Sequence, residues 1–211
     1  MPWPVRRILL AKVLGYEIHR TARIGYSVVC PVRLKMGAGS RIGHFTVCKA
    51  GVELLRMGDH AILGNLNWVT GSPLNDAVHF KGDSARRSEL LIDDHASVTT
   101  RHFIDCTATV SIGMFSVFAG CRSTILSHSV DLSNCEQSCN PVSIGRYCFV
   151  GTASVLLPGA CLPNYSVLGA NSLLNKQYAD PYCLYAGSPA RRMKELPRTM
   201  KYFSRTVGFI E

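Results

Sequence analysis

The sequence predicts an all-β fold in which parallel strands wind into a solenoid of hexapeptide repeats. From Ile144 to Leu174 an aliphatic side chain recurs at every sixth position. A small residue stands four positions after each of the first five aliphatic residues, namely at Cys148, Ser154, Ala160, Ser166 and Ser172. A period of six fits neither an amphipathic helix nor a simple alternating strand. It fits a coil in which each side is one hexapeptide, with the aliphatic residue inside and the small residue at the corner.

The same period extends upstream in shorter runs. These runs are Ile18, Ile24 and Cys30; Ile42 and Cys48; Met57, Leu63 and Val69; Ile92, Val98, Ile104 and Val110; and, after a slip of two residues, Ile112 and Phe118. Two segments interrupt the period, the charged residues 72–89 and the Ser-, Asn- and Cys-rich residues 127–141. We expect both to project as loops from a single β-helix domain that spans residues 16–188.

The two ends of the chain have different patterns. Pro4 can start a helix that ends at Gly15, so residues 1–15 are predicted to form a capping helix. Its apolar residues are expected to cover the open first coil, as solenoid ends require; they are Val5, Ile8, Leu9 and Val13. The basic helix could instead lie against an anionic membrane, but capping explains the apolar face without a membrane and is the interpretation we prefer. Residues 189–211 are expected to form a helical tail, with helices over 190–196 and through Phe203.

Composition narrows the class of partner and the compartment. Lys and Arg number 23 against 14 Asp and Glu, a net charge of +9, which favours an anionic partner. The basic residues form no long block and no patch with interleaved aromatics, so a phosphorylated small molecule is expected rather than nucleic acid. Nine cysteines without framework spacing indicate reduced thiols in the cytoplasm. No apolar run approaches the ~20 residues of a membrane span, and no secretory signal is expected.

The repeat, a His-bearing loop and the tail motif together resemble the left-handed parallel β-helix acyltransferases. The matching parts are residues 144–172, His128 within ILSHSVDL, and AGSPAR at 186–191. Within that family the chain looks most like the sugar and polysaccharide O-acetyltransferases of the capsule and colanic-acid type. The resemblance implies left-handed winding, a homotrimer, acetyl-coenzyme A as acyl donor in the cleft between neighbouring solenoids, and a saccharide hydroxyl as acceptor.

His128 is the predicted catalytic base. Imidazole titrates near neutral pH, so it can take the proton of an acceptor hydroxyl as that oxygen attacks the thioester. Asp131, three residues later, could orient the imidazole or cap a turn, and both roles stay open. The donor to the oxyanion cannot be named from sequence, although Ser123 and Ser127 are weak candidates.

The resemblance also assigns cofactor-binding positions, each of which could instead be an ordinary turn or a solvated basic end. Asn at position 175 departs from the Thr of the family pattern. Basic side chains would neutralise the coenzyme A phosphates. The expected contacts are Thr152 and Ala170 with the pantetheine arm, Asn175 and Lys176 near the adenosine end, and Arg191 and Lys194 with the phosphates.

Several alternatives remain beside this hypothesis. No metal is expected, because Cys135 and Cys139 form one pair without a second. A hydratase like the γ-class carbonic anhydrases would need a His five residues after His128, where Ser133 stands. An N-acetyltransferase of amino sugars and a non-catalytic β-helix assembly protein stay open. Acceptor choice is expected to depend on the 72–89 insertion and its charged residues, Asp83, Arg86 and Arg87.

Overall fold

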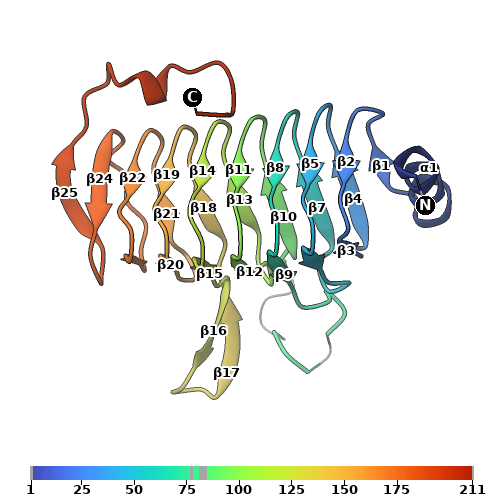
Figure 1. Ribbon diagram of the computed structural model, residues 1–211. Helices are drawn as coiled ribbons and strands as arrows, with labels where there is room; N and C mark the ends of the chain where they lie inside the picture. The colour runs from blue at the N-terminus through green and yellow to red at the C-terminus, as the bar shows by residue number, and fades with distance from the viewer. Residues whose placement is uncertain (1, 77, 81–84, 211) are drawn as a thin grey trace.

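The computed structural model describes residues 2–76, 78–80 and 85–210, which form three large sheets, parallel except at the last strand of one of them, together with a two-stranded antiparallel sheet and one N-terminal α-helix. Each coil contributes one strand to each sheet, so a strand pairs with its equivalent in the next coil (Figure 1). The first sheet contains β1 (Glu17–Ile18), β4 (Arg33–Met36), β7 (Leu54–Met57), β10 (Glu89–Ile92), β13 (Val110–Ile112), β18 (Val142–Ile144) and β21 (Cys161–Leu162).

The other two sheets complete the triangular coil. The second contains β2 (Arg23–Ile24), β5 (Arg41–Ile42), β8 (Ile62–Leu63), β11 (Ser97–Val98), β14 (Val117–Phe118), β19 (Phe149–Val150), β22 (Val167–Leu168), β24 (Cys183–Ala186) and β25 (Arg191–Glu195). The third contains β3 (Val28–Val29), β6 (Val47–Cys48), β9 (Trp68–Thr70), β12 (Phe103–Asp105), β15 (Thr124–Ile125), β20 (Val155–Leu156) and β23 (Leu173–Leu174).

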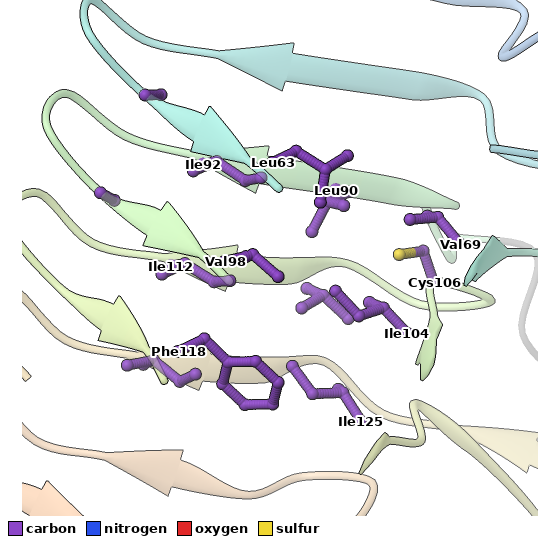
Figure 2. Close-up of a cluster of buried hydrophobic side chains, with 14 of the residues drawn as sticks. Leu63, Val69, Leu90, Ile92, Val98, Ile104, Cys106, Ile112, Phe118 and Ile125 are labelled. Atoms are coloured by element: carbon purple, nitrogen blue, oxygen red, sulfur yellow. The ribbon is translucent and has the colours of Figure 1, made fainter. Parts of the chain in front are cut away.

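The core is the inside of the coil, as the six-residue period predicts. The six aliphatic residues from Ile144 to Leu174 are at most 3% exposed, and the five small corner residues are also buried. Figure 2 shows side chains from successive coils, among them Leu63, Val98 and Phe118, stacked in this interior. One upstream assignment is wrong: Cys30 is exposed and Val29 is buried in its place, because alternation along the two-residue β3 turns Val29 inward.

Close coil packing explains a glycine at one corner. A Cβ on Gly64 would lie 2.0 Å from the carbonyl oxygen of Thr99 in the next coil. That distance is far inside van der Waals contact, so a side chain there would force neighbouring coils apart.

The two interruptions of the period project from the coil. Residues 128–139 form an antiparallel hairpin of β16 (His128–Asp131) and β17 (Glu136–Cys139) below β15 (Figure 1). The described residues of the other insertion contain no strand before β10 begins at Glu89. Asp83 lies outside the described residues.

Helix α1 (Trp3–Leu14) lies at the N-terminal end of the solenoid, but its orientation differs from the predicted one. The residues expected to cap the coil, Val5, Ile8, Leu9 and Val13, are 47–68% exposed. The opposite side makes the contacts: the Trp3 indole donates to the Ala22 carbonyl (2.9 Å), and Arg6 donates to the Gly25 carbonyl (2.8 Å). The capping prediction for the apolar face is therefore wrong. The first coil presents unpaired carbonyl groups at its edge, and these select side chains that donate hydrogen bonds.

The C-terminal segment is also not the predicted helical tail. Residues 191–195 form β25, which pairs antiparallel with β24, because the last coil leaves a strand edge to be covered. The following helical element is the single 3₁₀ turn η1 (Lys201–Phe203). The tail then folds back along the solenoid, where the Tyr147 hydroxyl donates to the Arg205 carbonyl (3.0 Å). Among the residues described, no helix is long and apolar enough to cross a membrane.

Candidate active site

His128 stands at the corner where the chain leaves β15 and enters the projecting hairpin. Its Nδ1 lies 2.7 Å from Oδ2 of Asp105, the last residue of β12 in the preceding coil. The Asp105 side chain is 2% exposed, whereas that of His128 is 38% exposed. With Nδ1 engaged, Nε2 is the ring nitrogen left to exchange a proton with a ligand.

The Asp105 carboxylate is held on both oxygens. Ser127 donates to Oδ2 from its backbone N–H and from its hydroxyl, each at 2.9 Å, and the Thr107 hydroxyl donates to Oδ1 at 2.7 Å. Burial raises the pKa of Asp105, but the hydrogen bonds from His128, Thr107 and Ser127 outweigh burial and leave that pKa below its ordinary value. The group is therefore an ionised carboxylate at neutral pH.

This carboxylate sets the charge behaviour of the imidazole. The hydrogen bond to Asp105 raises the pKa of His128 above its ordinary value; burial opposes this rise, and the negative charge of Asp105 adds to it. A buried carboxylate on Nδ1 also fixes the tautomer that carries a proton there, leaving the lone pair on Nε2. Asp105 and His128 thus form an acid–base pair with one side open to solvent.

The described part of the 72–89 insertion forms a wall beside this pair. The Phe80 ring packs edge-on against the His128 ring, with centroids 5.9 Å apart and planes at 87°. The Arg86 guanidinium lies 4.8 Å from the Phe80 centroid and donates to the carbonyls of Ser72 (2.9 Å) and Thr107 (3.2 Å). A third bond joins Arg86 to the Pro73 carbonyl. Arg86 therefore fastens the insertion to the coil instead of presenting its charge to a ligand.

A hollow of about 220 Å³ opens between the wall and the hairpin. It combines two imidazoles with hydroxyl and amide groups, which can recognise a neutral polar ligand. The lining residues are Thr70, Gly71, Ser72, His79, Phe80, Asp105, Thr107, His128 and Gln137.

Asp131 is not the partner of His128, so its predicted orienting role is wrong. Its carboxylate accepts from the backbone N–H of Ser133 (2.8 Å) and from the side-chain amide of Asn134 (2.9 Å) at the tip of the hairpin. These bonds lower its pKa, the Asn134 amide making the largest contribution. Asp131 instead caps the hairpin turn, which was the alternative role. Strand β16 leads away from the coil, so Asp131, three residues after His128, lies at the far end of that strand.

The weak oxyanion candidates are used within the coils. The Ser127 hydroxyl accepts from the Ala108 N–H (2.9 Å) while donating to Asp105. The Ser123 hydroxyl donates to the Gly151 carbonyl (3.3 Å) and accepts from the Ser154 N–H (3.1 Å). Neither hydroxyl is directed toward a ligand.

The expected cofactor positions fall at two corners of the coil and on the tail. Thr152 and Ala170 follow β19 and β22 in consecutive coils, and the Thr152 hydroxyl donates to the Cys121 carbonyl (2.8 Å). Asn175 and Lys176 follow β23, at the corner that His128 occupies two coils earlier. Arg191 and Lys194 lie exposed on β25.

These positions offer accessible cations at a corner of the coil and on the tail. The side chains of Asn175, Lys176, Arg191 and Lys194 are all exposed. Lys176 lies 5.1 Å from the centroid of the Tyr178 ring. In the part of the chain that the structure describes, no group of three or more His, Cys, Asp or Glu side chains could hold a metal ion.

Comparisons with known proteins identify the fold. No family model and no curated protein matches the chain. Among solved structures, the polysialic acid O-acetyltransferase OatWY is 20% identical, with 90% of each chain covered and a TM-score of 0.52. A hexapeptide-repeat acetyltransferase from Vibrio cholerae is 18% identical, covering 93% of this chain and 82% of its own, with a TM-score of 0.50.

A third structure has the same architecture with a different acceptor chemistry. The N-acyltransferase AntD from Bacillus cereus, in complex with dTDP-4-amino-4,6-dideoxyglucose and coenzyme A, is 13% identical. The match covers 94% of this chain and 93% of AntD, with a TM-score of 0.50. Identities this low speak for the architecture alone, and the architecture agrees across all three. The chain has the fold of the hexapeptide-repeat acetyltransferases.

Proposed function

We propose that the protein transfers an acetyl group from acetyl-coenzyme A to a hydroxyl of a saccharide. The observation that carries this proposal is the Asp105–His128 pair, a fixed imidazole base at the edge of a polar hollow. The resemblance of the fold to an O-acetyltransferase that acts on polysialic acid, and to an acyltransferase holding coenzyme A, supports it.

The pair performs the proton transfers that the reaction needs. Nε2 of His128 accepts the proton of the acceptor hydroxyl as its oxygen bonds to the thioester carbonyl carbon. Asp105 stabilises the imidazolium that results. When the carbon–sulfur bond breaks, Nε2 returns the proton to the departing thiolate, so the products are the acetyl ester and coenzyme A.

The coenzyme would be held by the positions that the resemblance assigns. Lys176, Arg191 and Lys194 supply exposed cations for its phosphates, while Thr152 and Ala170 would lie along the pantetheine arm with Asn175 near the adenosine. We place these contacts between neighbouring chains of a left-handed, trimeric β-helix in the cytoplasm. Support for an assembly comes from the outward row of the third sheet, which is apolar except for Thr124: Val28, Val47, Trp68, Phe103, Val155 and Leu173.

An amino sugar is the second candidate acceptor, since AntD has the same fold. The lining of the hollow favours a hydroxyl. Asp105 is the one acid among the described lining residues, and its carboxylate is committed to His128, Ser127 and Thr107. An ammonium group would therefore find no carboxylate of its own there.

Calorimetric titration of acetyl-coenzyme A into the parent protein and into His128→Ala tests the proposal. Both should bind about one molecule per chain, and a thiol-release assay with saccharide acceptors should show a rate ~10²–10⁴-fold lower in His128→Ala. His19→Ala, which removes an exposed His from the first coil, is the matched control and should keep the parent rate. Absence of binding in parent and variant alike would favour an assembly protein over an enzyme.

A further inference from the structure

Nearly all of the net charge lies in the first quarter of the chain. Residues 1–52 contain nine Lys or Arg and one acid, Glu17, so this quarter contributes +8 of the total +9. It comprises α1 and the coils nearest to it, at one end of the solenoid (Figure 1). A charge asymmetry of this size indicates an extended anionic partner at that end.

The same end exposes an apolar helix face. Val5, Ile8, Leu9 and Val13 recur at helical spacing, and each is about half exposed or more. The inward side of α1 is occupied by Trp3, Arg6, Arg7 and Leu10, so the helix is attached to the coil without using its aliphatic residues. Contiguous exposed apolar surface of this kind marks an interaction site.

Cations surround this face. Lys12 lies on the face itself, between Leu9 and Val13, while Arg20, Arg23 and Arg41 are exposed on the adjoining coils. Among the described residues no ion pair engages these four, whereas Lys35 is paired with Glu17 at 2.8 Å. Exposed aliphatic side chains flanked by unpaired cations can contact an anionic lipid surface, where each nearby cation adds electrostatic attraction.

We propose that α1 docks the protein onto an anionic lipid surface, with Val5, Ile8, Leu9 and Val13 entering the boundary between headgroups and acyl chains. Lys12, Arg20 and Arg23 then contact the headgroups. Nucleic acid would match the charge but leave the aliphatic face in water. A second copy placed face to face would bring two strongly cationic ends together, which repel each other. Docking at this end leaves the hairpin and the hollow at His128 free, so it is independent of the acetyl transfer.

Sedimentation with vesicles tests this proposal, using equal parts of phosphatidylglycerol and phosphatidylcholine, and phosphatidylcholine alone as comparison. The parent protein should pellet with the anionic vesicles, and about 0.5 M salt should weaken binding by screening the cations. Ile8→Ser with Leu9→Ser should weaken binding at least tenfold. Arg20→Gln with Arg23→Gln should weaken it roughly 25-fold, because each cation near such a surface contributes about fivefold.

Two matched controls keep the experiment decisive. Val130→Ser with Leu132→Ser removes two exposed apolar side chains at the hairpin, and Arg122→Gln with Lys201→Gln removes two exposed cations elsewhere; both should bind like the parent. Circular dichroism melts should show that the Ile8 and Leu9 variant folds, since neither residue is buried.

Three results would overturn the proposal. Equal pelleting with neutral vesicles would remove the role of the cations, and unchanged binding of both the Ile8/Leu9 variant and the Arg20/Arg23 variant would place the contact elsewhere. A change in oligomer mass on altering Ile8 and Leu9, without any vesicle binding by the parent, would show that a second copy covers the face. The rate of acetyl transfer to a soluble acceptor should be the same in the parent, the Ile8/Leu9 variant and the Arg20/Arg23 variant, so failure of the docking proposal leaves the enzymatic one intact.

Discussion

Replacing Asp105 by Asn removes the negative charge beside Nδ1 of His128 while nearly preserving the shape of the side chain. The carboxylate accepts from His128, from two donors on Ser127 and from Thr107. An Asn side chain has one acceptor oxygen, so part of this donor set would face an NH₂ group. In the native site the bond to Asp105 raises the pKa of His128 and burial lowers it. In Asp105→Asn the burial of His128 remains, but the hydrogen bond to a carboxylate that raises its pKa is lost. The pKa of His128 should therefore fall.

Two measurements follow from that change. An NMR titration of the His128 ring should give a lower pKa in Asp105→Asn than in the parent. Because the base acts in its neutral form, the acidic limb of kcat/KM should move to lower pH, while the plateau falls by ~10²–10⁴ as the tautomer and the imidazolium lose their partner. Simple unfolding would lower the rate without moving the acidic limb of the pH profile. A lower rate together with a limb shifted to lower pH therefore indicates that Asp105 positions His128.

Asp131→Asn is the matched control, since its carboxylate accepts hydrogen bonds from Ser133 and Asn134 within the hairpin turn. In this variant the pH profile of kcat/KM should have the same acidic limb and the same plateau as in the parent. If Asp105→Asn left the His128 titration unmoved, or if Asp131→Asn shifted it equally, the assignment of Asp105 as the positioning carboxylate would be refuted.

Three further expectations concern the wall, the pH dependence and the core. Phe80→Ala or Arg86→Ala should lower kcat/KM about tenfold with unchanged affinity for acetyl-coenzyme A, because each loosens the wall beside His128. Phe80→Leu should recover part of the loss. The side chain of Arg87 is exposed, so an equal loss of kcat/KM in Arg87→Ala would count against a specific role of the wall. The raised pKa of His128 means that its pairing stabilises the fold fully below its ordinary pKa and that this stabilisation is lost as pH rises through the folded value. The difference in unfolding free energy between the parent and His128→Ala should therefore be larger near pH 5.5 than near pH 9, and an equal difference at both would contradict the pairing. Leu55→Ala, at a fully buried position stacked in register between Leu34 and Leu90, should cost about 2–5 kcal/mol in urea unfolding, whereas Leu132→Ala on the hairpin should cost almost nothing.

The solenoid could be predicted because its signal is repeated. Each hexapeptide repeats the same pattern of one aliphatic and one small residue, so the wrong assignment at Cys30 leaves the period of the neighbouring repeats intact. The ends carry no such redundancy. In residues 190–196 a helical propensity competes with the open edge of β24, and pairing with that edge decides the structure.

Helix α1 shows a second limit of sequence patterns. The apolar face was visible, but which face meets the coil depends on what the coil offers. The first coil of the solenoid offers carbonyl oxygens at its edge, so the indole of Trp3 and the guanidinium of Arg6 are the better caps. A pattern locates an apolar face without naming its neighbour, and in the described part of the chain the aliphatic residues of α1 remain exposed.

The missed carboxylate shows what a repeat can reveal when its register is used. Ile104 pairs with Ile125 across β12 and β15, so Asp105 stands in line with the residue that precedes Ser127 and His128. Ile104 belongs to the predicted inward set, whereas Ile125 is shown to be inward by the structure; one residue beyond Ile104 stands an acid at the corner from which the His128 hairpin departs. Sequence distance concealed it: 23 residues separate Asp105 from His128, against three for Asp131. In a solenoid, neighbours in space are one coil apart in the chain, so a partner for a corner residue should be sought one coil away before it is sought in the same loop.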